Sequence, residues 1–468
     1  MNSKYKYLIK NTSVLAISNF SSKLLVFFLV PLYTGVLTPK EYGTFDLISS
    51  TIALLTPILT LNIVDGVMRF SMDANESKEE VATIGFIFEF VGCLLFSVII
   101  YINKFFGLIQ TICGLENLIL MYMFTFVFVS YMTQLSKGQE KIFDMGIAGI
   151  LGTITSVLLN IYFLLKLKLG FIGFFYASIL SSFTQIIYYF FRLKIWQLIR
   201  ISSVSKRLTK DMVIYSAPII LSTLGWWVNG AADKYIVALF CGVSSNGLLA
   251  ISYKIPTIIN TVLSIFSQAW HISAIKEYEN GDDFYKQMFE YYNLLMCVSC
   301  SALIMLTRPL ASFLFAKDFY SAWQYVPLLL VCSVLSGAGG FIGPMLSARK
   351  DSKTLAKSAI ISSTTNIILN IILTYLIGIH GAVIATVVSS YVIYLYRKSV
   401  IGNKIESKLY SSIMIVWILL IMQSFIEIYL KNYYMQAVIF VTILLLMQKP
   451  IRKFLNKFSG RLKKQQVG

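Results

Sequence analysis

The sequence is poor in charged residues. Asp, Glu, Lys and Arg make up only 13% of its 468 residues, whereas about 25% is usual in soluble domains. Hydrophobic residues reach 57%, and the mean hydropathy is +0.73. Such a composition cannot cover a soluble surface with polar side chains. We therefore predict an all-α polytopic membrane protein.

Signatures of common catalytic sites are also absent from the sequence. It contains no phosphate-binding loop, no nucleophile elbow and no HExxH zinc motif. The two histidines, His271 and His380, are far apart and suggest no metal site. Cys297 and Cys300 have a redox or zinc spacing, but they lie in an apolar run without a second pair. We therefore expect no enzymatic activity, no metal and no cofactor.

Acidic residues are scarce, at 22 against 40 Lys and Arg, and this imbalance follows a topological pattern. Apolar runs predict about fourteen membrane spans. Lys and Arg are concentrated in the loops on the side that holds the N-terminus, as in cytoplasmic loops. We therefore place both termini in the cytoplasm and attribute the net charge of +18 to topology, not to nucleic-acid binding. The predicted spans are residues 11–37, 42–64, 81–103, 117–135, 142–165, 170–191, 212–241, 247–272, 285–307, 322–346, 354–377, 381–400, 410–430 and 433–448.

The two halves of the chain resemble each other. Residues 173–182 read GFFYASILSS, and residues 381–390 read GAVIATVVSS, with glycine, alanine and a serine pair in register. Upstream, Asn160 in the first half corresponds to Asn370 in the second. The repeat unit contains an even number of spans, so both halves enter the membrane in the same direction.

This repeat predicts the organisation of the chain. Two six-helix lobes in parallel repeat, related by an axis along the membrane normal, leave a cleft between them. The last two spans fall outside the repeat and form an appendage. The predicted parts are an N-lobe (residues 1–205), a C-lobe (residues 206–402), and two extra C-terminal helices with a basic cytoplasmic tail (residues 403–468).

The seventh predicted span, within residues 211–241, carries two charged residues. Asp233 and Lys234 follow Trp226 and Trp227 in an otherwise apolar segment. A charge near the bilayer centre costs about 2.5–3.5 kcal/mol on insertion scales, so such side chains usually face a bundle interior or a wet cavity. We expect this segment to line a water-filled path. The alternative is a structural ion pair that touches no substrate.

Two other predicted spans contain sequences that break helices. In the eighth span, Pro256 follows Tyr253 and Lys254, and an internal proline removes a helical hydrogen bond. In the tenth span, residues 336–344 read SGAGGFIGP, a second candidate break. Broken helices in membranes line cavities or are buried in protein.

Four segments carry a resemblance to a known family. They read LTPKEYG (residues 37–43), APIILSTLGWWVNGAADKYIVALF (217–240), FAKDFYSAW (315–323) and NIILNIILTYLIGIHGAVIAT (366–386). In this order they resemble the polysaccharide transporter family, the Wzx-type flippases for O-antigen, capsule and related units. That family belongs to a superfamily with the MATE exporters and the lipid II flippases, and the likeness covers nearly the whole chain.

The resemblance implies a V-shaped, MATE-like fold of two lobes. It implies translocation of undecaprenyl-diphosphate-linked oligosaccharide repeat units from the cytoplasmic to the outer leaflet, for O-antigen (lipopolysaccharide), capsule or exopolysaccharide synthesis. The expected location is the bacterial plasma (inner) membrane. The expected partners are this glycan, the lipid bilayer, and a polysaccharide polymerase with its chain-length machinery.

Cations outnumber acids inside the predicted spans. Lys23, Lys234 and Lys254 face one clear acid in the same spans, Asp233, besides Asp46 near an outer end. A cleft with net positive charge suits an anionic diphosphate. Snorkelling or a structural ion pair is the alternative for each lysine. The aromatic residues expected to offer apolar faces to sugar rings are Trp226, Trp227, Tyr253 and Trp270.

Coupling to H+ or Na+ follows by analogy with the family. Asp233 and His271 are the titratable candidates, because the reference pKa of histidine lies near neutrality. The family pattern places an acidic–basic pair in the seventh span, where arginine is commoner than the Lys234 of this chain. A lysine lacks the bidentate geometry with which arginine holds a pyrophosphate.

Three rival functions are distinguishable. A MATE-type exporter of cationic drugs would need an acidic cavity, whereas this chain offers cations. A lipid II flippase would share the lipid carrier and be essential for growth. A membrane-embedded glycosyltransferase or polymerase would need acidic catalytic or metal-binding residues beside large loops, and the longest polar connection, residues 192–210, is rich in cations.

Overall fold

The computed structural model is helical throughout its described residues. These are residues 27–200, 204–276, 282–450 and 452. The chain divides into two compact units, Met1–Ala231 (unit 1) and Ala232–Gly468 (unit 2). α11 (Ile219–Cys241) contains the boundary between them.

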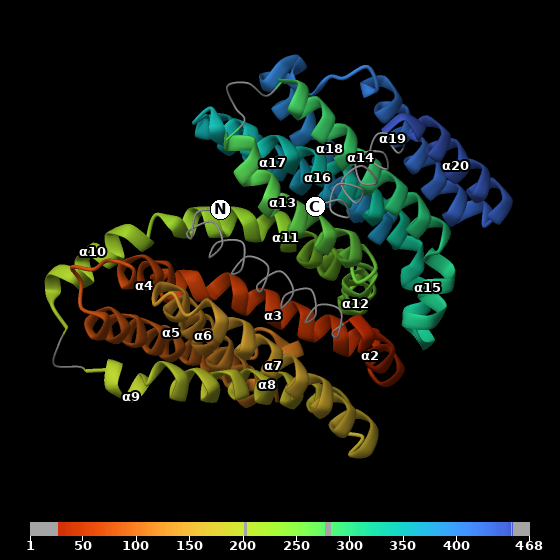
Figure 1. Ribbon diagram of the computed structural model, residues 1–468. Coiled ribbons are helices and arrows are strands. Elements are labelled where there is room, and N and C mark those ends of the chain that lie inside the picture. Colours follow the sequence, from red (N-terminus) through yellow and green to blue (C-terminus); the bar gives the residue numbers. More distant parts are fainter. Residues whose placement is uncertain (1–26, 201–203, 277–281, 451, 453–468) are drawn as a thin grey trace, which may run out of the picture. The chain divides into compact units, whose positions relative to one another are not determined.

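Unit 1 is a bundle of long helices, of which α3, α5, α6, α7 and α8 run lengthwise (Figure 1). Its helices are α2 (Val30–Val36), α3 (Pro39–Leu59), α4 (Ile63–Ser71), α5 (Lys78–Phe106), α6 (Glu116–Gly138), α7 (Ile142–Ile161), α8 (Gly170–Leu193), α9 (Ile195–Leu198) and α10 (Lys206–Ser216).

Unit 2 is a second bundle, in which α16 packs against α13, α14 and α18 (Figure 1). Its helices after α11 are α12 (Val243–Ser252), α13 (Pro256–Lys276), α14 (Asp282–Met305), α15 (Thr307–Leu314), α16 (Val326–Ala348), α17 (Ser352–Ile377), α18 (Ile379–Ile401), α19 (Tyr410–Phe425) and α20 (Tyr433–Leu446).

The number of spans differs from the predicted fourteen. Ten helices in the described ranges are long and apolar enough to cross a membrane, and up to twelve if each of two bent helix pairs is one span. The predicted span 11–37 lies largely outside the described residues, which include only its end and α2. The predicted span 433–448 corresponds to α20, which has only 14 residues.

Capping residues set the ends of the long helices. α3 begins at Pro39 behind Thr38, whose side chain and that of Glu41 form a reciprocal capping box. Ser77 caps α5 by accepting a hydrogen bond from a backbone N–H of the first turn, and Gly107 ends that helix with φ at 62°. Glycine adopts this left-handed conformation at low cost, so the chain turns directly after α5.

A break separates α3 from α4. Leu61 and Asn62 both have positive φ, at 52° and 50°. The left-handed conformation costs non-glycine residues roughly 1–2 kcal/mol each and persists only where the surroundings impose it. Pro57 lies in the last turn of α3. The span that the sequence predicts as continuous over 42–64 therefore ends in a strained turn.

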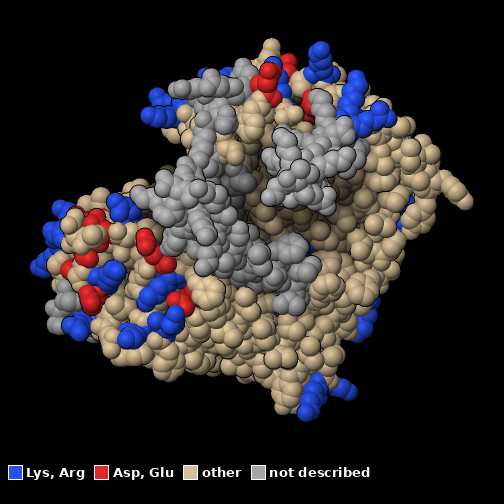
Figure 2. All heavy atoms as spheres, viewed as in Figure 1, with Lys and Arg blue, Asp and Glu red and all other residues tan. Residues whose placement is uncertain are grey.

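Large apolar side chains cover the outer faces of the helices. On α5, Leu94 and Val98 are 52% and 55% exposed. In Figure 2 the charged side chains visible on unit 1 gather mainly where α4 ends and α5 and α10 begin, a smaller basic group lies at the opposite end, and the flank between them is uncharged. Lipid-facing helices with charges at their ends have this distribution.

The predicted break at SGAGGFIGP is wrong, because α16 continues through residues 336–344 without interruption. The small residues serve packing instead. A side chain at Gly337 would overlap the Tyr292 hydroxyl of α14, and one at Gly339 would lie 3.1 Å from Ile393 of α18. Glycines let helix backbones approach closely in membranes.

α19 and α20 pack on α14 through polar contacts. Trp417 of α19 donates to Asn293 Oδ1 of α14 at 3.0 Å. The Ser301 hydroxyl donates to Gln423 Oε1 at 2.7 Å, and Gln423 returns a bond to the Ser301 carbonyl. Gln436 of α20 then donates to the Gln423 carbonyl at 3.1 Å. These bonds attach the two C-terminal helices to unit 2.

A buried ion pair closes this interface. The guanidinium of Arg308 lies 2.7 Å from Glu427, whose side chain is fully buried. We expect Arg308→Ala to lower the free energy of unfolding in detergent by about 3–5 kcal/mol, because it leaves a buried carboxylate without its cation. Thermal unfolding of the purified chain measures this effect.

Two variants control this prediction. Lys398→Ala removes a more exposed ion pair with Glu406 and should cost less than about 1 kcal/mol. The double variant Arg308→Met, Glu427→Met removes both charges and should recover much of the lost stability. Equal losses in the single and double variants would contradict the burial argument.

Candidate functional site

A buried carboxyl group marks the most unusual environment of unit 2. Asp233 lies in α11 and is only 5% exposed. Its Oδ1 accepts a hydrogen bond from the Asn370 amide at 2.5 Å, and its Oδ2 accepts one from the Thr386 hydroxyl at 2.6 Å. These donors are neutral, so they solvate the carboxyl group without cancelling its charge. The site can therefore take up a small cation or a proton.

A stripe of polar residues on α17 provides this environment. The buried residues of α17 recur at every fourth position, so that each lies about one turn beyond the last, in a stripe that winds slowly around the helix. The opposite side carries exposed apolar residues such as Ile368 and Ile372. The helix thus turns its polar side to the protein and its apolar side outward. The buried positions are Thr354, Ser358, Ser362, Asn366, Asn370 and Thr374.

Hydrogen bonds extend the cluster from α17 to α18. The Thr374 hydroxyl donates to Asn370 Oδ1 at 2.6 Å, which orients the Asn370 amide toward Asp233. The Asn366 amide donates to Ser389 Oγ at 3.3 Å. The Thr386 Oγ1 also lies 2.9 Å from the carbonyl oxygen of Ala382 on its own helix, α18. The cluster is therefore preorganised by two helices that pack closely against each other.

The break at Pro256 borders the same cluster. α12 ends at Ser252, α13 begins at Pro256, and the pair is bent by 52°, which confirms the predicted break. Tyr253, at the end of α12, lies near enough to Asp233 to interact with it electrostatically. Tyr253, which the sequence predicts to contact sugars, and Asp233, which it predicts to couple an ion, therefore lie together. Lys254 lies next to them in the chain, within the break, and is partly buried.

The remaining predicted site residues lie elsewhere. Lys23 and the Trp226 side chain fall outside the described part of the structure. Trp227 belongs to unit 1 and donates to the Ser50 carbonyl at 2.8 Å. Lys234 is partly buried on α11, and His271 is exposed on α13.

Trp270 is a packing residue in this structure. It is 3% exposed, its indole N–H donates to the Phe341 carbonyl at 2.7 Å, and its ring stacks on Phe341 with 4.2 Å between centroids. Phe284 also stacks on it. A sugar would need these rings to move, so a sugar-binding role of Trp270 stays a prediction.

The repeat counterpart of Asn370 has different neighbours. Asn160 in α7 is 1% exposed, and its amide donates to the carbonyl and hydroxyl oxygens of Ser156, one turn earlier. The two asparagines match in sequence, but only Asn370 reaches a carboxyl group on another helix. The cluster around Asp233 is therefore particular to unit 2.

Sequence reasoning missed Asn366, Asn370, Thr374 and Thr386 as site residues. The segment NIILNIILT contained the signal, because its polar residues are spaced by four while the rest is aliphatic. In a membrane helix this spacing predicts a polar side turned to the protein interior.

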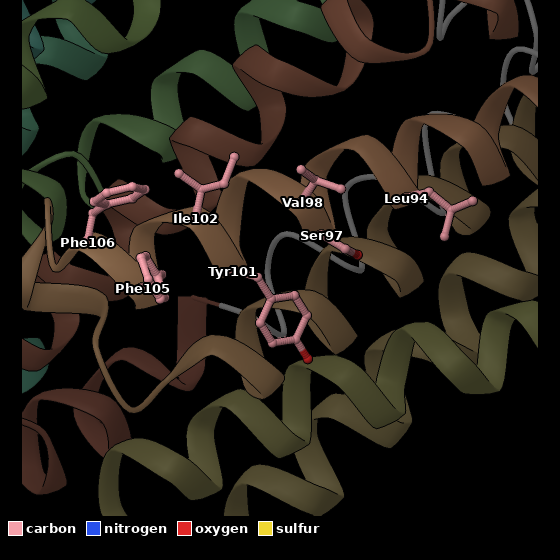
Figure 3. Close-up of a pocket in the computed structure, with 7 residues that line it drawn as sticks. All are labelled: Leu94, Ser97, Val98, Tyr101, Ile102, Phe105 and Phe106. Carbon is pink, nitrogen blue, oxygen red and sulfur yellow. The ribbon is translucent and has the colours of Figure 1, made fainter.

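A groove of about 480 Å³ runs along the outer side of α5 (Figure 3). Its lining is apolar except for Ser97 and Tyr101, and the Ser97 hydroxyl already donates to the Cys93 carbonyl. The groove has no charged group that could hold a diphosphate. Its lining residues are Leu94, Ser97, Val98, Tyr101, Ile102, Phe105 and Phe106.

Comparison with known proteins identifies related sequences. The profile of a family described as "Polysaccharide biosynthesis protein" matches residues 8–271. The "Probable low-salt glycan biosynthesis flippase Agl15" of Haloferax volcanii is 24% identical over 205 residues, which are 42% of this chain and 43% of that protein. The matched region thus spans less than half of the relative.

Solved transporters share the fold. The "Lipid II flippase MurJ" in an inward closed conformation has a TM-score of 0.68 at 16% identity, covering 94% of this chain and 99% of that one. An inward-facing multidrug resistance MATE family transporter has a TM-score of 0.64 at 16% identity, covering 84% and 99%. An outward-facing MATE transporter has a TM-score of 0.55 at 15% identity, covering 85% and 94%. The predicted all-helical, MATE-like membrane fold is confirmed.

The cluster around Asp233 makes a testable prediction for stability. We expect Asn370→Ala to lower the free energy of unfolding by about 2 kcal/mol, because a buried carboxyl group loses a donor. The same substitution in an Asp233→Ala background should cost much less. Denaturant unfolding in detergent, as a double-mutant cycle, measures the coupling.

Ile368→Ala is the matched control, because Ile368 lies two residues from Asn370 on the exposed side of α17. Ile368→Ala should change the free energy of unfolding by the same amount in the native chain and in the Asp233→Ala background. Additive effects of Asn370→Ala and Asp233→Ala would show that the hydrogen bond contributes nothing to stability.

Proposed function

Because the chain belongs to the polysaccharide biosynthesis protein family, we propose that it is a flippase for lipid-linked glycans. Its substrate is an undecaprenyl-diphosphate-linked oligosaccharide repeat unit, moved from the cytoplasmic to the outer leaflet by alternating access. The family match and the likeness to the lipid II flippase over 94% of the chain support this proposal. The product enters O-antigen, capsule or exopolysaccharide synthesis.

The proposed function also implies a cellular location, a membrane topology and partners for the protein. The protein resides in a bacterial inner membrane with both termini in the cytoplasm, as its basic loops favour. Two lobes, residues 1–205 and 206–402, alternate their access, and residues 403–468 form the appendage. A polysaccharide polymerase and its chain-length machinery receive the exported unit.

Lysines within the spans are proposed to receive the diphosphate. Lys254 lies in the broken span, at the 52° bend between α12 and α13, and such breaks at membrane depth line a cavity or are buried in protein. Lys234 lies on α11 beside the buried Asp233. Lys23 is assigned by its place in the first predicted span. Tyr253, Trp226 and Trp227 are proposed to contact the sugars.

Export of the glycan tests the role of these cations. We expect Lys23→Ala, Lys234→Ala and Lys254→Ala together to reduce surface glycan by about tenfold or more, since the loss of even 1.4 kcal/mol of binding is tenfold. Lys166→Ala, at an exposed position after α7, should have no effect. Immunoblots of surface glycan and of membrane-inserted protein give both readouts. Undiminished export by the triple variant would contradict the cationic cleft.

Asp233 is proposed as the ion-coupling residue. Its carboxyl oxygens accept bonds from the Asn370 amide nitrogen and the Thr386 hydroxyl, an arrangement that suits a proton. A hard cation such as Na+ would require the Asn370 amide to turn its oxygen toward the site. His271 is exposed on α13 and is the second titratable candidate. An ion bound at Asp233 would bias the packing of α11 against α17 and α18.

Liposome transport with imposed gradients tests this coupling. We expect a pH or Na+ gradient to accelerate lipid-linked glycan transport by the native chain severalfold, and Asp233→Asn to abolish this acceleration. His271→Gln is the parallel variant, which should retain it if Asp233 carries the ion. If the rate of transport by the native chain depended on neither the pH gradient nor the Na+ gradient, ion coupling would be contradicted.

A lipid II flippase is the second candidate, favoured by the structural likeness to MurJ. The two substrates would share the lipid diphosphate and differ in the sugar. Depletion of the chain distinguishes them, because loss of a lipid II flippase arrests growth, whereas loss of a repeat-unit flippase removes the surface glycan. Efflux of cationic dyes would instead indicate a MATE-type exporter.

A further inference from the structure

We propose that Glu89 of unit 1 is a second ion-coupling residue, which binds a proton and releases it when the broken span α3–α4 separates from α5. Glu89 lies in the middle of α5 and is 0% exposed. Neither of its carboxyl oxygens has a hydrogen-bond partner among the described residues. This inference rests on the proposed transport function and adds a site to it.

The environment of Glu89 favours its neutral, protonated form. Transfer of an isolated carboxylate into a medium of low dielectric is so costly that the group takes up a proton instead. Two other buried acids, Glu427 and Asp144, have charged or polar donors. Glu427 is paired with Arg308, and Asp144 accepts bonds from Arg192 and Tyr188. Glu89 differs from them, because neither of its carboxyl oxygens has such a donor among the described residues.

Two glycines bring the broken span against Glu89. Gly85 and Gly92 lie one turn before and after it, on the same side of α5. A side chain at Gly92 would lie 2.5 Å from Thr60, at the end of α3. One at Gly85 would overlap Val67 of α4 and lie 2.7 Å from the Tyr131 ring of α6. Glu89 thus faces the segment where α3 gives way to α4.

That segment is the strained turn described above. Its Leu61 and Asn62 adopt left-handed conformations, and the surrounding packing imposes them. The Thr60 hydroxyl, which faces Glu89, donates to the Thr56 carbonyl at 2.9 Å. The turn also contains a hydrogen bond from the Asn62 amide to Asp65, and a strained turn of this kind is suited to change when its neighbour becomes charged.

No cation among the described neighbours compensates an ionised Glu89. The titratable groups placed against it are Cys93 of α5 and Tyr131 of α6, and the Tyr131 hydroxyl donates to the Ala82 carbonyl. Asp65 of α4 is held by Asn62 and Gln134. α3 contributes Thr60, and α9 contains no ionisable residue.

Release of the proton therefore requires water. When α3–α4 moves away, water reaches the carboxyl group, its O–H bond breaks, and the proton passes to that water. When the helices close again, the carboxylate must regain a proton before it is buried. One proton is exchanged per opening, and the conformational equilibrium depends on pH accordingly.

Two measurements on the full chain in lipid nanodiscs test this inference. Infrared difference spectra should show that Glu89→Gln loses the intensity of one buried carboxylic acid at neutral pH. Glu427→Gln is the matched control, since an ion-paired carboxylate contributes no such band. Hydrogen exchange of residues 57–66 should then rise with pH in the native chain relative to Glu89→Gln, by up to tenfold per pH unit.

Three outcomes would overturn the inference. The first is an unchanged carboxylic-acid band in Glu89→Gln, and the second is a ratio of exchange rates that is constant with pH. The third is failure of Glu89→Gln to fold, because a site built for a neutral acid should accept its neutral isostere. Neither measurement uses a glycan. If the native chain transported no glycan but its hydrogen exchange still depended on pH as expected, only the proposed function would be contradicted.

Discussion

Every polar group that this chain places at membrane depth needs a partner inside the protein, because hydrocarbon offers none. This constraint explains why α17 buries its threonines, serines and asparagines and exposes its aliphatic residues. It also explains why α19 and α20 are attached to α14 by amide, hydroxyl and indole groups. Which side chains are buried in such a protein therefore depends on their hydrogen-bonding groups as much as on their apolar surface.

The two units meet this constraint in different ways. In unit 2, the Asp233 carboxyl group accepts hydrogen bonds from side chains of α17 and α18. In unit 1, neither carboxyl oxygen of Glu89 has a hydrogen-bond partner in the described structure, and the neutral form that we infer is the one that such burial favours. Both acids lie beside a broken span, at Tyr253–Pro256 and at Leu61–Asn62. At a break the helical hydrogen bonds are already interrupted. A change of charge beside it can therefore move a helix while disrupting few further bonds.

Small residues have opposite consequences in the two units. In α16, Gly337 and Gly339 let neighbouring helices approach, and the helix stays intact through a segment that its composition marks as a break. In α5, Gly85 and Gly92 admit a span that is itself broken. Glycine content alone therefore does not locate a break, and neither does proline alone, because the chain breaks at Pro256 whereas α16 continues without interruption through Pro344.

Local chemistry in the sequence determined the helical membrane class, the break at Pro256 and the presence of a buried charge at Asp233. These depend on composition, on periodicity, or on one residue and its neighbours. Only the tertiary structure decided the partners of Asp233, since Asn370 and Thr386 are 137 and 153 residues away. It also placed Trp270 in tight packing and left Glu89 without a donor. Periodicity tells which side chains share a face of one helix, but the face they meet depends on how distant helices pack.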